Sequence, residues 1–257
     1  RHWKRRKTKT TMTNLILSIK STTIHEIANI LNVPLFFNKN RIGQEDRGIL
    51  VRWGNTQRIN FDVERELNSR EAIKKASNKA LCRKLLAEAN VPVPLATETI
   101  YPCIGRRTKH RAGRGFFFCK NAQDVARAKI KGATYFSCFY PKTNEFRISV
   151  GSGKVIVVSE KIGDKTKYNW NKRMGFTFRH LPKREWINNA DLREMIRTAK
   201  KAMRVIKLDF GAIDIGAFPT DTSLPKFVIF EINTSPSLSP LAQKKYIRYF
   251  KRIIYGT

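Results

Sequence analysis

The stretch FEINTSPSLSP, residues 230–240, places a carboxylate, Glu231, and a carboxamide, Asn233, two positions apart at the end of an apolar run. The run reads as a β-strand, and Pro236 ends it. Because residues i and i+2 of a strand point to the same face, Glu231 and Asn233 would present two oxygen ligands side by side. Such a pair suits Mg²⁺, although taken alone it fits an ordinary strand end with a turn-forming asparagine better.

A second apolar segment, GAIDIGAF (residues 211–218), lies shortly before this one and carries a further carboxylate, Asp214. A polar loop marked by prolines joins the two segments, which predicts a β-hairpin. In that hairpin Asp214 can face Glu231, so that three oxygen donors converge with Asn233. Hard ligands of this kind favour Mg²⁺ that carries nucleotide phosphates, and none of them is a preferred zinc ligand.

A glycine-rich basic segment, IGRRTKHRAGRGFFFC (residues 104–119), is the second candidate site. Its glycines permit a loop to close, and its guanidinium groups can donate forked hydrogen bonds to phosphate. The segment is not a P-loop, so a phosphate-binding lid and a solvated basic loop or nucleic-acid contact both stay open. The candidate residues of this lid are Arg106, Arg107, Lys109, His110, Arg111, Gly113, Arg114 and Gly115.

A third segment, TNEFRISV (residues 143–150), places Glu145 and Arg147 on one face of a strand. Such an arginine is commonly a salt-bridge partner, but beside a triphosphate it could neutralise developing charge. The sequence contains no Ser-His-Asp order, no G-x-S-x-G motif, no glycosidase carboxylate pair and no Rossmann fingerprint.

Composition bounds the classes of protein that fit. The chain has 257 residues, 41% of them hydrophobic, and a formal net charge of +31. The apolar fraction is enough for a core, and no apolar run approaches the length of a membrane span. Four scattered cysteines disfavour zinc and indicate reduced thiols in a cytosolic-type compartment. The charge implies a polyanionic partner or acidic surroundings and says nothing about the fold.

Periodicity predicts an α/β opening followed by antiparallel strands. A capping box at Thr23 and Glu26 begins the first helix, and residues 55–77 read as a polar connector. The predicted strands are residues 15–19, 49–53, 115–119, 133–140, 146–150, 154–159, 211–218 and 226–232, and the further helices are 78–89, 121–131, 191–206 and 246–254. We expect Leu81, Leu85 and Ala89 to face inward on the second helix. On the last helix we expect Ile247, Phe250 and Ile254 to be buried and Lys244, Lys245, Arg248, Lys251 and Arg252 to face outward.

The order of these pieces resembles the ATP-grasp superfamily, particularly the carboxylate–amine ligases related to ribosomal-protein glutamate ligases. Small ATP-grasp proteins of bacteriophages are also similar, through Arg52-Trp53-Gly54 at the end of the opening lobe. The resemblance covers about residues 15–241, and LDFGAIDIG and FEINTSPSLSP are its most specific parts. It implies an α/β (α+β) fold of three lobes, with ATP between a small lid-bearing lobe and a larger antiparallel lobe. The implied divisions are a basic arm (1–13), an N-terminal substrate-side α/β lobe with its connector (14–77), the small lobe (78–140) and the C-terminal lobe (141–257).

The resemblance also implies the cofactors, ATP and two Mg²⁺ ions, and a role for each matching residue. Asp214, Glu231 and Asn233 match the metal ligands of the family. Arg147 matches the arginine that contacts phosphate and the acyl intermediate, and Lys161 matches a basic residue that faces the phosphates. Arg106 stands where the family usually has its first nucleotide-binding lysine. The lid would contain Arg107, Lys109, His110, Gly113 and Gly115. Phe139 and Tyr140 would border the adenine ring. The chain departs from the family at Ser137-Cys138, where an acidic or amide pair is usual, and at Ser235-Pro236-Ser237, where proline-glycine is usual. Neither departure removes a metal ligand.

The activity implied is ATP-dependent amide or peptide ligation through an acylphosphate. Two alternatives are a phosphotransferase of the inositol-phosphate-kinase type and a non-catalytic nucleic-acid-binding protein on the same scaffold. The charge supports the second alternative, and the complete metal triad argues against it. The excess of positive charge predicts that the substrate that accepts the new amide bond, or the molecule that carries it, is nucleic acid or an acidic protein. The cations of this excess include Lys165, Lys167, Lys172 and Arg173. We expect a cytoplasmic protein, in the host cytoplasm if it is of phage origin, without a membrane partner.

Overall fold

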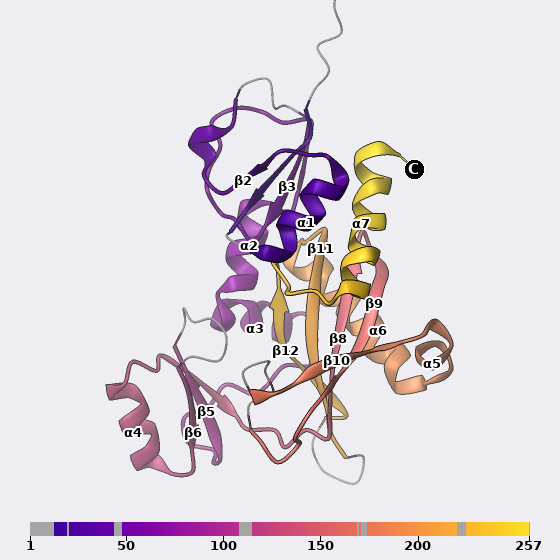
Figure 1. Ribbon diagram of the computed structural model, residues 1–257. Coiled ribbons are helices and arrows are strands. Elements are labelled where there is room, and N and C mark those ends of the chain that lie inside the picture. The colour runs from indigo at the N-terminus through magenta and orange to yellow at the C-terminus, as the bar shows by residue number, and fades with distance from the viewer. Residues whose placement is uncertain are drawn as a thin grey trace, which may run out of the picture.

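A computed structural model describes residues 13–19, 21–43, 48–107, 115–168, 170, 174–219 and 225–256. The strands of these residues form three sheets, and helices cover them (Figure 1). Several residues singled out from the sequence lie outside the described residues, namely most of the basic arm and Lys109, His110, Arg111, Gly113, Arg114, Lys172 and Arg173. None of the described helices is long and apolar enough to cross a membrane.

The N-terminal sheet is parallel, with the order β2-β1-β3-β4. Its strands are β1 (Leu15–Ser18), β2 (Leu35–Phe36), β3 (Ile49–Trp53) and β4 (Arg65–Leu67), with the short 3₁₀ helix η1 (Lys39–Arg41) between β2 and β3. The helix α1 (Thr22–Leu31) follows β1 and buries Ile24, Ile27, Ala28 and Leu31. The strand–helix–strand opening predicted from the sequence is therefore confirmed.

Two predictions for this part of the chain were wrong. The N-cap of α1 is Ser21, one residue before the helix, and it makes no side-chain capping hydrogen bond, so the capping box at Thr23 does not form. Residues 55–77 contain β4 and the helix α2 (Arg70–Ser77), whose N-cap Ser69 accepts a hydrogen bond from the amide of Ala72. The apolar positions of α2 are few and lie among charged residues, which hid the helix from a search for hydrophobic periodicity.

Asn68 connects the N-terminal region to the central sheet. Its side chain is fully buried and accepts hydrogen bonds from the amides of Asp209 and Phe210, at 2.8 and 3.1 Å, and donates one to the carbonyl of Phe210 at 2.9 Å. The backbone of Asn68 is left-handed, with φ of 63°, a conformation that asparagine tolerates better than most residues. This one side chain therefore satisfies backbone groups at the start of another strand.

The small sheet is antiparallel, with the order β6-β5-β7. Its strands are β5 (Cys103–Arg106), β6 (Phe116–Cys119) and β7 (Tyr135–Cys138), and the helix α4 (Ala122–Ile130) packs on one face. Asn121 caps α4 as predicted, by accepting a hydrogen bond from Asp124. β5 was not predicted as a strand, because it is short and includes Gly105 and Arg106.

Three of the four cysteines lie in one row across this small sheet. Cys103 pairs with Cys119 on one side and with Cys138 on the other. All four cysteines are free thiols, and burial raises the pKa of Cys82 and of Cys103 to about 11. The sequence had predicted reduced thiols, and the structure contains no disulfide among them.

The central sheet is antiparallel, with the order β10-β9-β8-β11-β12. Its strands are β8 (Asn144–Gly151), β9 (Lys154–Ile162), β10 (Thr177–Leu181), β11 (Phe210–Ala217) and β12 (Phe227–Asn233). The tight turn between β8 and β9 uses positive φ angles at Ser152 and Gly153. β11 and β12 form the predicted hairpin, and β10 was not foreseen.

Helices α2, α3 (Lys79–Glu88), α5 (Lys183–Asn188) and α6 (Ala190–Ile206) lie beside the central sheet (Figure 1). α6 was predicted as a helix at 191–206, and it buries one face, which carries Leu192, Met195, Ile196, Ala199, Ala202, Met203 and Ile206. The inward face predicted for α3 was wrong at Leu81, which is 39% exposed, whereas Leu85 and Ala89 pack partly buried against the core. The buried residues of α3 are Cys82, Arg83 and Leu86.

The last helix, α7 (Pro240–Tyr255), begins six residues earlier than predicted. Ser239 caps it by accepting a hydrogen bond from the amide of Ala242, and proline occupies its first turn, where a missing amide costs nothing. α7 packs against α1 and contributes Tyr246 and Phe250 to a core that includes Trp53 and Phe210. Ile247 and Phe250 are buried as predicted, and Ile254 is only partly buried.

Candidate active site

One row of polar side chains crosses all five strands of the central sheet. In order across the sheet these are His180, Ser159, Arg147, Asp214 and Glu231, each in register with the next. Residues opposite one another on antiparallel strands share a face, so the five side chains line one side of the sheet. A row of polar groups on a sheet face has to be satisfied by neighbours or by a ligand.

Asp214 lies at the centre of this row and is held by Arg147 through two hydrogen bonds. Arg147 donates from Nε to Oδ1 at 2.7 Å and from Nη2 to Oδ2 at 2.8 Å, which is the bidentate geometry of the strongest charge-assisted pairs. Asn233 donates from Nδ2 to the same Oδ2 at 3.4 Å. The predicted approach of Asp214 to Glu231 across the hairpin is confirmed by their register, and Asn233 joins them.

The surrounding cations keep both carboxylates ionised although they are deeply placed. Burial alone would raise the pKa of Asp214, but the charges of Arg147 and Lys161 lower it to about 2. Burial likewise opposes ionisation of Glu231, and the charge of Lys79 outweighs it, so the pKa of Glu231 lies below its usual value. Both groups are therefore anionic oxygen donors at neutral pH.

A second ionic cluster lies one row further along the same face. Lys161 forms an ion pair with Glu145, and its Nζ is 3.9 Å from Oδ2 of Asp214. Lys142 contacts the other oxygen of Glu145 at 3.0 Å and lies over the ring of Trp170, 4.7 Å from its centroid. Lys161, predicted from the sequence, therefore faces the same site as Arg147, and Lys142 is an addition that the sequence reasoning did not identify.

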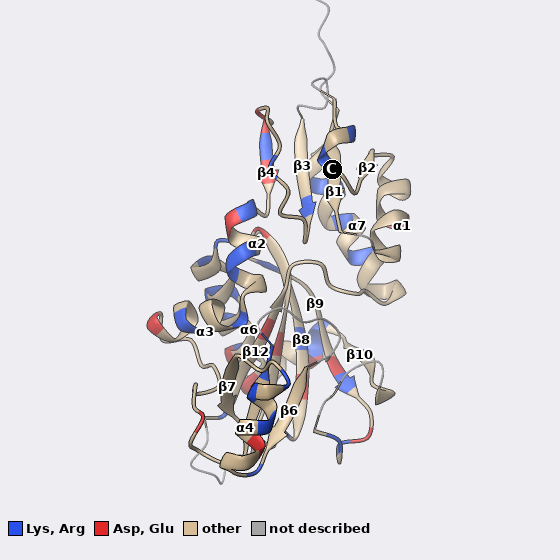
Figure 2. Ribbon diagram, turned by 90° about the vertical axis from the view of Figure 1, so that its left-hand side faces the viewer, with Lys and Arg blue, Asp and Glu red and all other residues tan. Residues whose placement is uncertain are grey.

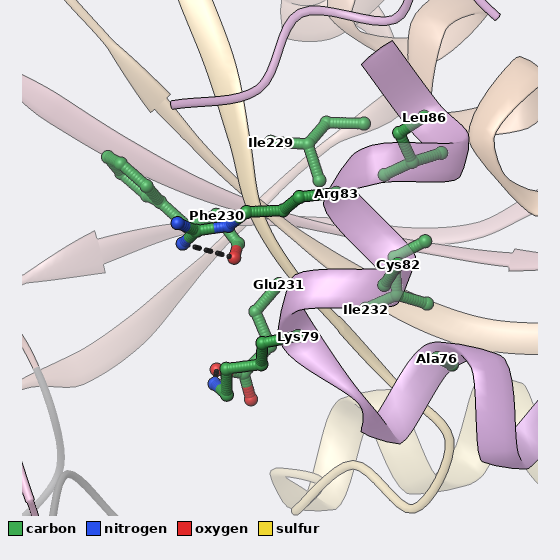
Figure 3. A pocket seen from close by; sticks show the side chains of 9 residues that line it. All are labelled: Ala76, Lys79, Cys82, Arg83, Leu86, Ile229, Phe230, Glu231 and Ile232. Carbon is green, nitrogen blue, oxygen red and sulfur yellow. Dashed lines mark hydrogen bonds and ion pairs between the residues drawn. The ribbon is translucent and has the colours of Figure 1, made fainter. Parts of the chain in front are cut away.

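Lys79 and Arg83, on the inner face of α3, are further residues of the site that sequence reasoning missed (Figure 3). Lys79 forms an ion pair with Glu231. Arg83 donates to the carbonyl of Phe230 at 3.1 Å, and from its other terminal nitrogen to the hydroxyls of Tyr135 and Ser137. Their spacing of four residues, one helical turn, was the available signal, because it places two cations on the face that carries Leu86.

Arg106 reaches the site from the small sheet. It is the last residue of β5, and its guanidinium lies 5.2 Å from the centroid of Phe116. Burial and the nearby charge of Arg83 lower the pKa of Arg106 to about 10. Its buried Nε has no hydrogen-bond partner among the described residues. An unsatisfied buried donor of this kind is commonly completed by a ligand or a water molecule.

The two remaining lid residues that the structure describes, Arg107 and Gly115, lie next to each other. Arg107 is turned away toward α4, where Nε and Nη2 donate to the carbonyl of Lys131 at 3.1 and 2.6 Å. Gly115 has φ of +70°, and a Cβ there would lie 3.0 Å from the side chain of Arg107. Lys109, His110 and Gly113 lie outside the described residues. The role of the lid as a phosphate clamp stays a prediction.

The two aromatic residues predicted to border adenine have different surroundings. Phe139 packs edge-on against Phe118, with centroids 5.0 Å apart, and against Tyr168. Phe118 and Tyr168 stack with centroids 4.2 Å apart and an interplanar angle of 11°. Tyr140 instead contacts Phe218. Phe139 therefore belongs to an aromatic cluster between the small sheet and the β9–β10 connection, and Tyr140 does not.

His180, at the far end of the polar row, was not singled out from the sequence. Its Nδ1 is 2.8 Å from Oγ of Ser159, and its Nε2 is 2.5 Å from Oγ of Ser239, the cap of α7. Burial and the charge of Lys245 lower the pKa of His180 below its usual value. The imidazole is therefore neutral at physiological pH and is fixed between two hydroxyl groups.

The donor set fits Mg²⁺ that is shared with phosphate. Asp214 and Glu231 supply carboxylate oxygens, and Asn233 can supply an amide oxygen. In the described part of the chain, this site included, no three His, Cys, Asp or Glu side chains gather to hold a metal ion, so the protein offers only two carboxylates and an amide here. Mg²⁺ is usually bound by one or two carboxylates, with phosphates and waters completing its shell, so this incomplete protein shell suits it.

Comparisons with known proteins agree on the fold. No protein-family model matches the sequence, and no curated protein matches it. Among solved structures, D-alanine–D-alanine ligase from Bacillus anthracis matches with a TM-score of 0.70 and 12% identity, over 95% of this chain and 96% of that chain. The ATP-grasp ligase PsnB, complexed with its minimal precursor, matches with a TM-score of 0.64 and 13% identity, over 94% and 99% of the two chains.

A third match is the macrocyclase MdnC from Microcystis aeruginosa MRC, bound with the precursor peptide MdnA, with a TM-score of 0.61 and 12% identity over 95% of this chain and 99% of that chain. At these identities the likeness concerns the fold. The chain has the ATP-grasp fold, and the α/β fold class inferred from the sequence is confirmed.

Proposed function

We propose that this protein is an ATP-dependent carboxylate–amine ligase that forms amide or peptide bonds through an acylphosphate. The observation that carries the proposal is the register of Arg147, Asp214 and Glu231 on three adjacent strands, with Lys161 beside them. Two ionised carboxylates and two cations on one rigid sheet face form an arrangement that can hold metal-bound phosphates and neutralise their transfer.

The structural neighbours support ATP and Mg²⁺ as the cofactors. PsnB has been solved with Mg and ADP, and D-alanine–D-alanine ligase from Bacillus anthracis with ATP. In this chain Asp214, Glu231 and Asn233 would hold Mg²⁺, and Arg106, Lys79 and Lys161 would contact the phosphates. The bound metal would supply charge neutralisation of the phosphate oxygens.

The residues of the chain then have separable tasks. Arg147 orients Asp214 and would contact the transferred phosphoryl group, since its forked donors match phosphate geometry. Lys161 balances Glu145 and adds positive charge on the same face. Positioning and charge stabilisation are most of what phosphoryl transfer requires of a protein. The substrate carboxylate would attack the γ-phosphorus of ATP, which would release ADP and give the acylphosphate. The amine would then attack the acyl carbonyl, lose a proton and displace phosphate, which would leave the amide.

A polyanionic substrate, or one carried by a polyanion, is part of this proposal. PsnB and MdnC are described with precursor peptides, which supports a peptide that supplies the carboxylate or the amine. The net charge of +31 exceeds what one nucleotide site needs, and it supports nucleic acid or an acidic protein as the acceptor or its carrier. We also propose a cytoplasmic location, because the four cysteines are scattered free thiols, as is usual in a reducing compartment.

The deciding experiment measures ADP and free phosphate with Mg²⁺-ATP and a panel of amino acids, acidic peptides and modified nucleotides. A ligase releases both products only when carboxylate and amine are present together. ADP with a phosphorylated product and no free phosphate would identify a phosphotransferase instead. Absence of turnover across the panel, together with nucleic-acid binding, would support the non-catalytic alternative. Glu231→Gln should abolish turnover, whereas Glu185→Gln, at an exposed ion pair with Arg179, is the matched control.

A further inference from the structure

The helix α7 has two faces of opposite character. Its inner face buries Tyr246, Ile247 and Phe250 against α1 and the N-terminal sheet. Between Pro240 and Tyr255 the helix carries five Lys or Arg residues and no Asp or Glu. Figure 2 shows blue segments along α7 with no red among them.

Four of these cations, Lys244, Arg248, Lys251 and Arg252, are exposed, and we call them the α7 basic face. At 100° per residue they fall within about 100° of arc, and their first and last members are separated by ~12 Å of helix rise. Within the described part of the chain, none of the four forms an ion pair.

The α7 basic face does not follow the pattern of an ordinary solvated helix. Lys244 precedes Arg248 by four residues, and Arg248 precedes Arg252 by four, so like charges are neighbours along the surface and weaken the helix. Lys244 also lies near the N-terminal end, where the helix dipole disfavours a cation. The exposed face of α6 differs, because Asp191 and Glu194 lie among its cations. Uniform positive charge without compensation is typical of a surface that meets a polyanion.

An aromatic ring lies on the same face. Tyr255 falls in the middle of the arc defined by the four cations and is 48% exposed. Its hydroxyl donates a hydrogen bond to the carbonyl of Leu31, at the end of α1, which fixes the ring. A fixed, half-exposed ring between cations can stack on an unpaired base, while the cations contact the backbone phosphates.

We propose that the α7 basic face, with Tyr255, binds single-stranded nucleic acid. Duplex DNA fits the surface less well, since its paired bases are stacked inside the helix and leave the half-exposed ring of Tyr255 no unpaired base to stack on. An acidic peptide would use the cations but gives the ring no base to stack on. The inference deepens the proposed function by placing the polyanion on one helix, and it is tested without ATP, so a failure of ligase activity leaves it standing.

The test is the salt dependence of binding between the full chain and a labelled oligothymidylate. Four phosphate contacts on a single strand predict a slope of log affinity against log salt of about −2.8, or a loss of about 50-fold between ~50 and ~200 mM salt. Replacing Lys244, Arg248, Lys251 and Arg252 together by glutamine should flatten the slope by about that amount. Tyr255→Ala should weaken binding about 5- to 150-fold with little change in slope.

The matched control removes the same charge from α6. Arg193, Arg197, Arg204 and Lys207 are exposed, and their replacement by glutamine gives a variant with the same net charge as the α7 variant. The proposal requires the α6 variant to keep the parental slope and near-parental affinity. Equal losses in both variants would show a general effect of net charge and would overturn the assignment to α7.

Three further outcomes would also overturn the proposal. One is the absence of oligothymidylate binding at ~50 mM salt. Another is a higher affinity for poly-glutamate than for oligothymidylate at equal salt, which would identify an acidic polypeptide as the partner. The last is a preference for duplex over single strand that Tyr255→Ala does not change. Circular dichroism of each variant checks that α7 remains folded.

Discussion

Asp214→Asn removes the charge on which the centre of the site depends, and its effect on stability can be worked out from the structure. Asp214 is 7% exposed and is bound through both oxygens by Arg147. The asparagine keeps the shape of the side chain but leaves the Arg147 guanidinium with its nearest counterion gone. Breaking a buried ion pair from one side typically costs about 3–5 kcal/mol.

The pKa of Asp214 gives a second, independent value for the free energy that this carboxylate contributes to folding. The folded carboxyl of Asp214 has a pKa of about 2, against about 3.9 in an unfolded chain, and each pKa unit corresponds to about 1.4 kcal/mol. Ionisation therefore contributes about 2–3 kcal/mol to folding. Because the folded-state pKa is the lower one, this contribution is complete above about pH 4 and is lost as the pH falls toward about 2.

The assay is urea unfolding of the parent, Asp214→Asn, Arg147→Gln and the double variant at pH 7 and at lower pH. We expect Asp214→Asn to lose about 3 kcal/mol, which corresponds to a melting temperature lower by about 6–12 °C in a chain of this size. We expect the double variant to lose less than the sum of the single variants. Glu185→Gln should change stability by less than about 0.5 kcal/mol.

A loss below about 1 kcal/mol for Asp214→Asn, with additive single changes, would refute this reasoning. It would mean that Asp214 and Arg147 are not paired in the folded protein, and the metal assignment would lose its geometric basis. ATP turnover of the same variant should be abolished whatever its stability, since a ligand of the proposed metal site is missing.

Three further predictions concern Lys79, His180 and the cysteines of the small sheet. Lys79→Ala should weaken nucleotide binding about 10- to 100-fold in calorimetry, since a charged hydrogen bond is worth about 1.5–3 kcal/mol, and unchanged affinity would exclude a phosphate contact. NMR titration should give His180 a pKa below the usual histidine value, because burial and the charge of Lys245 both lower that pKa. Lys245→Ala should therefore raise the pKa of His180, and a pKa at or above the usual value in the parent would contradict the enclosed geometry. In the native protein Cys103 and Cys119 should react with a thiol reagent far more slowly than Cys138, because they are buried and Cys138 is partly exposed. In denaturant all three should react at the same rate, and equal rates in the native protein would contradict the burial.

The sequence predicted the hairpin of β11 and β12 because two simple regularities coincide there. Alternation along a strand places Glu231 and Asn233 on one face, and a short loop forces neighbouring strands to pair antiparallel. Together they bring Asp214 opposite Glu231 without any long-range information. The candidate metal ligands could therefore be predicted from the local pattern, and their role stays a prediction.

The missed residues depend on contacts that no local pattern contains. The leucine spacing of α3 suggested an inner face through Leu81, but the helix turns Lys79 and Arg83 inward, since their partners are supplied by β12 and β7. β10 was missed because its site-facing residues include His180, so hydrophobic alternation is weak there. Residues that serve a site break the hydrophobic pattern by which elements are recognised.

Asn68 and the core around Trp53 join the N-terminal sheet to the central sheet. Trp53, Phe210 and Phe250 come from the N-terminal sheet, the central sheet and α7, yet they pack into one cluster. The small sheet instead has a core of its own, formed with α4. Cutting the chain after residue 77 would remove Trp53, which packs against both Phe210 and Phe250, so we expect the remainder not to fold independently. The N-terminal sheet, the central sheet and α7 therefore share one core, while the small sheet in the middle of the chain has its own, and we expect unfolding to proceed in at most those two units.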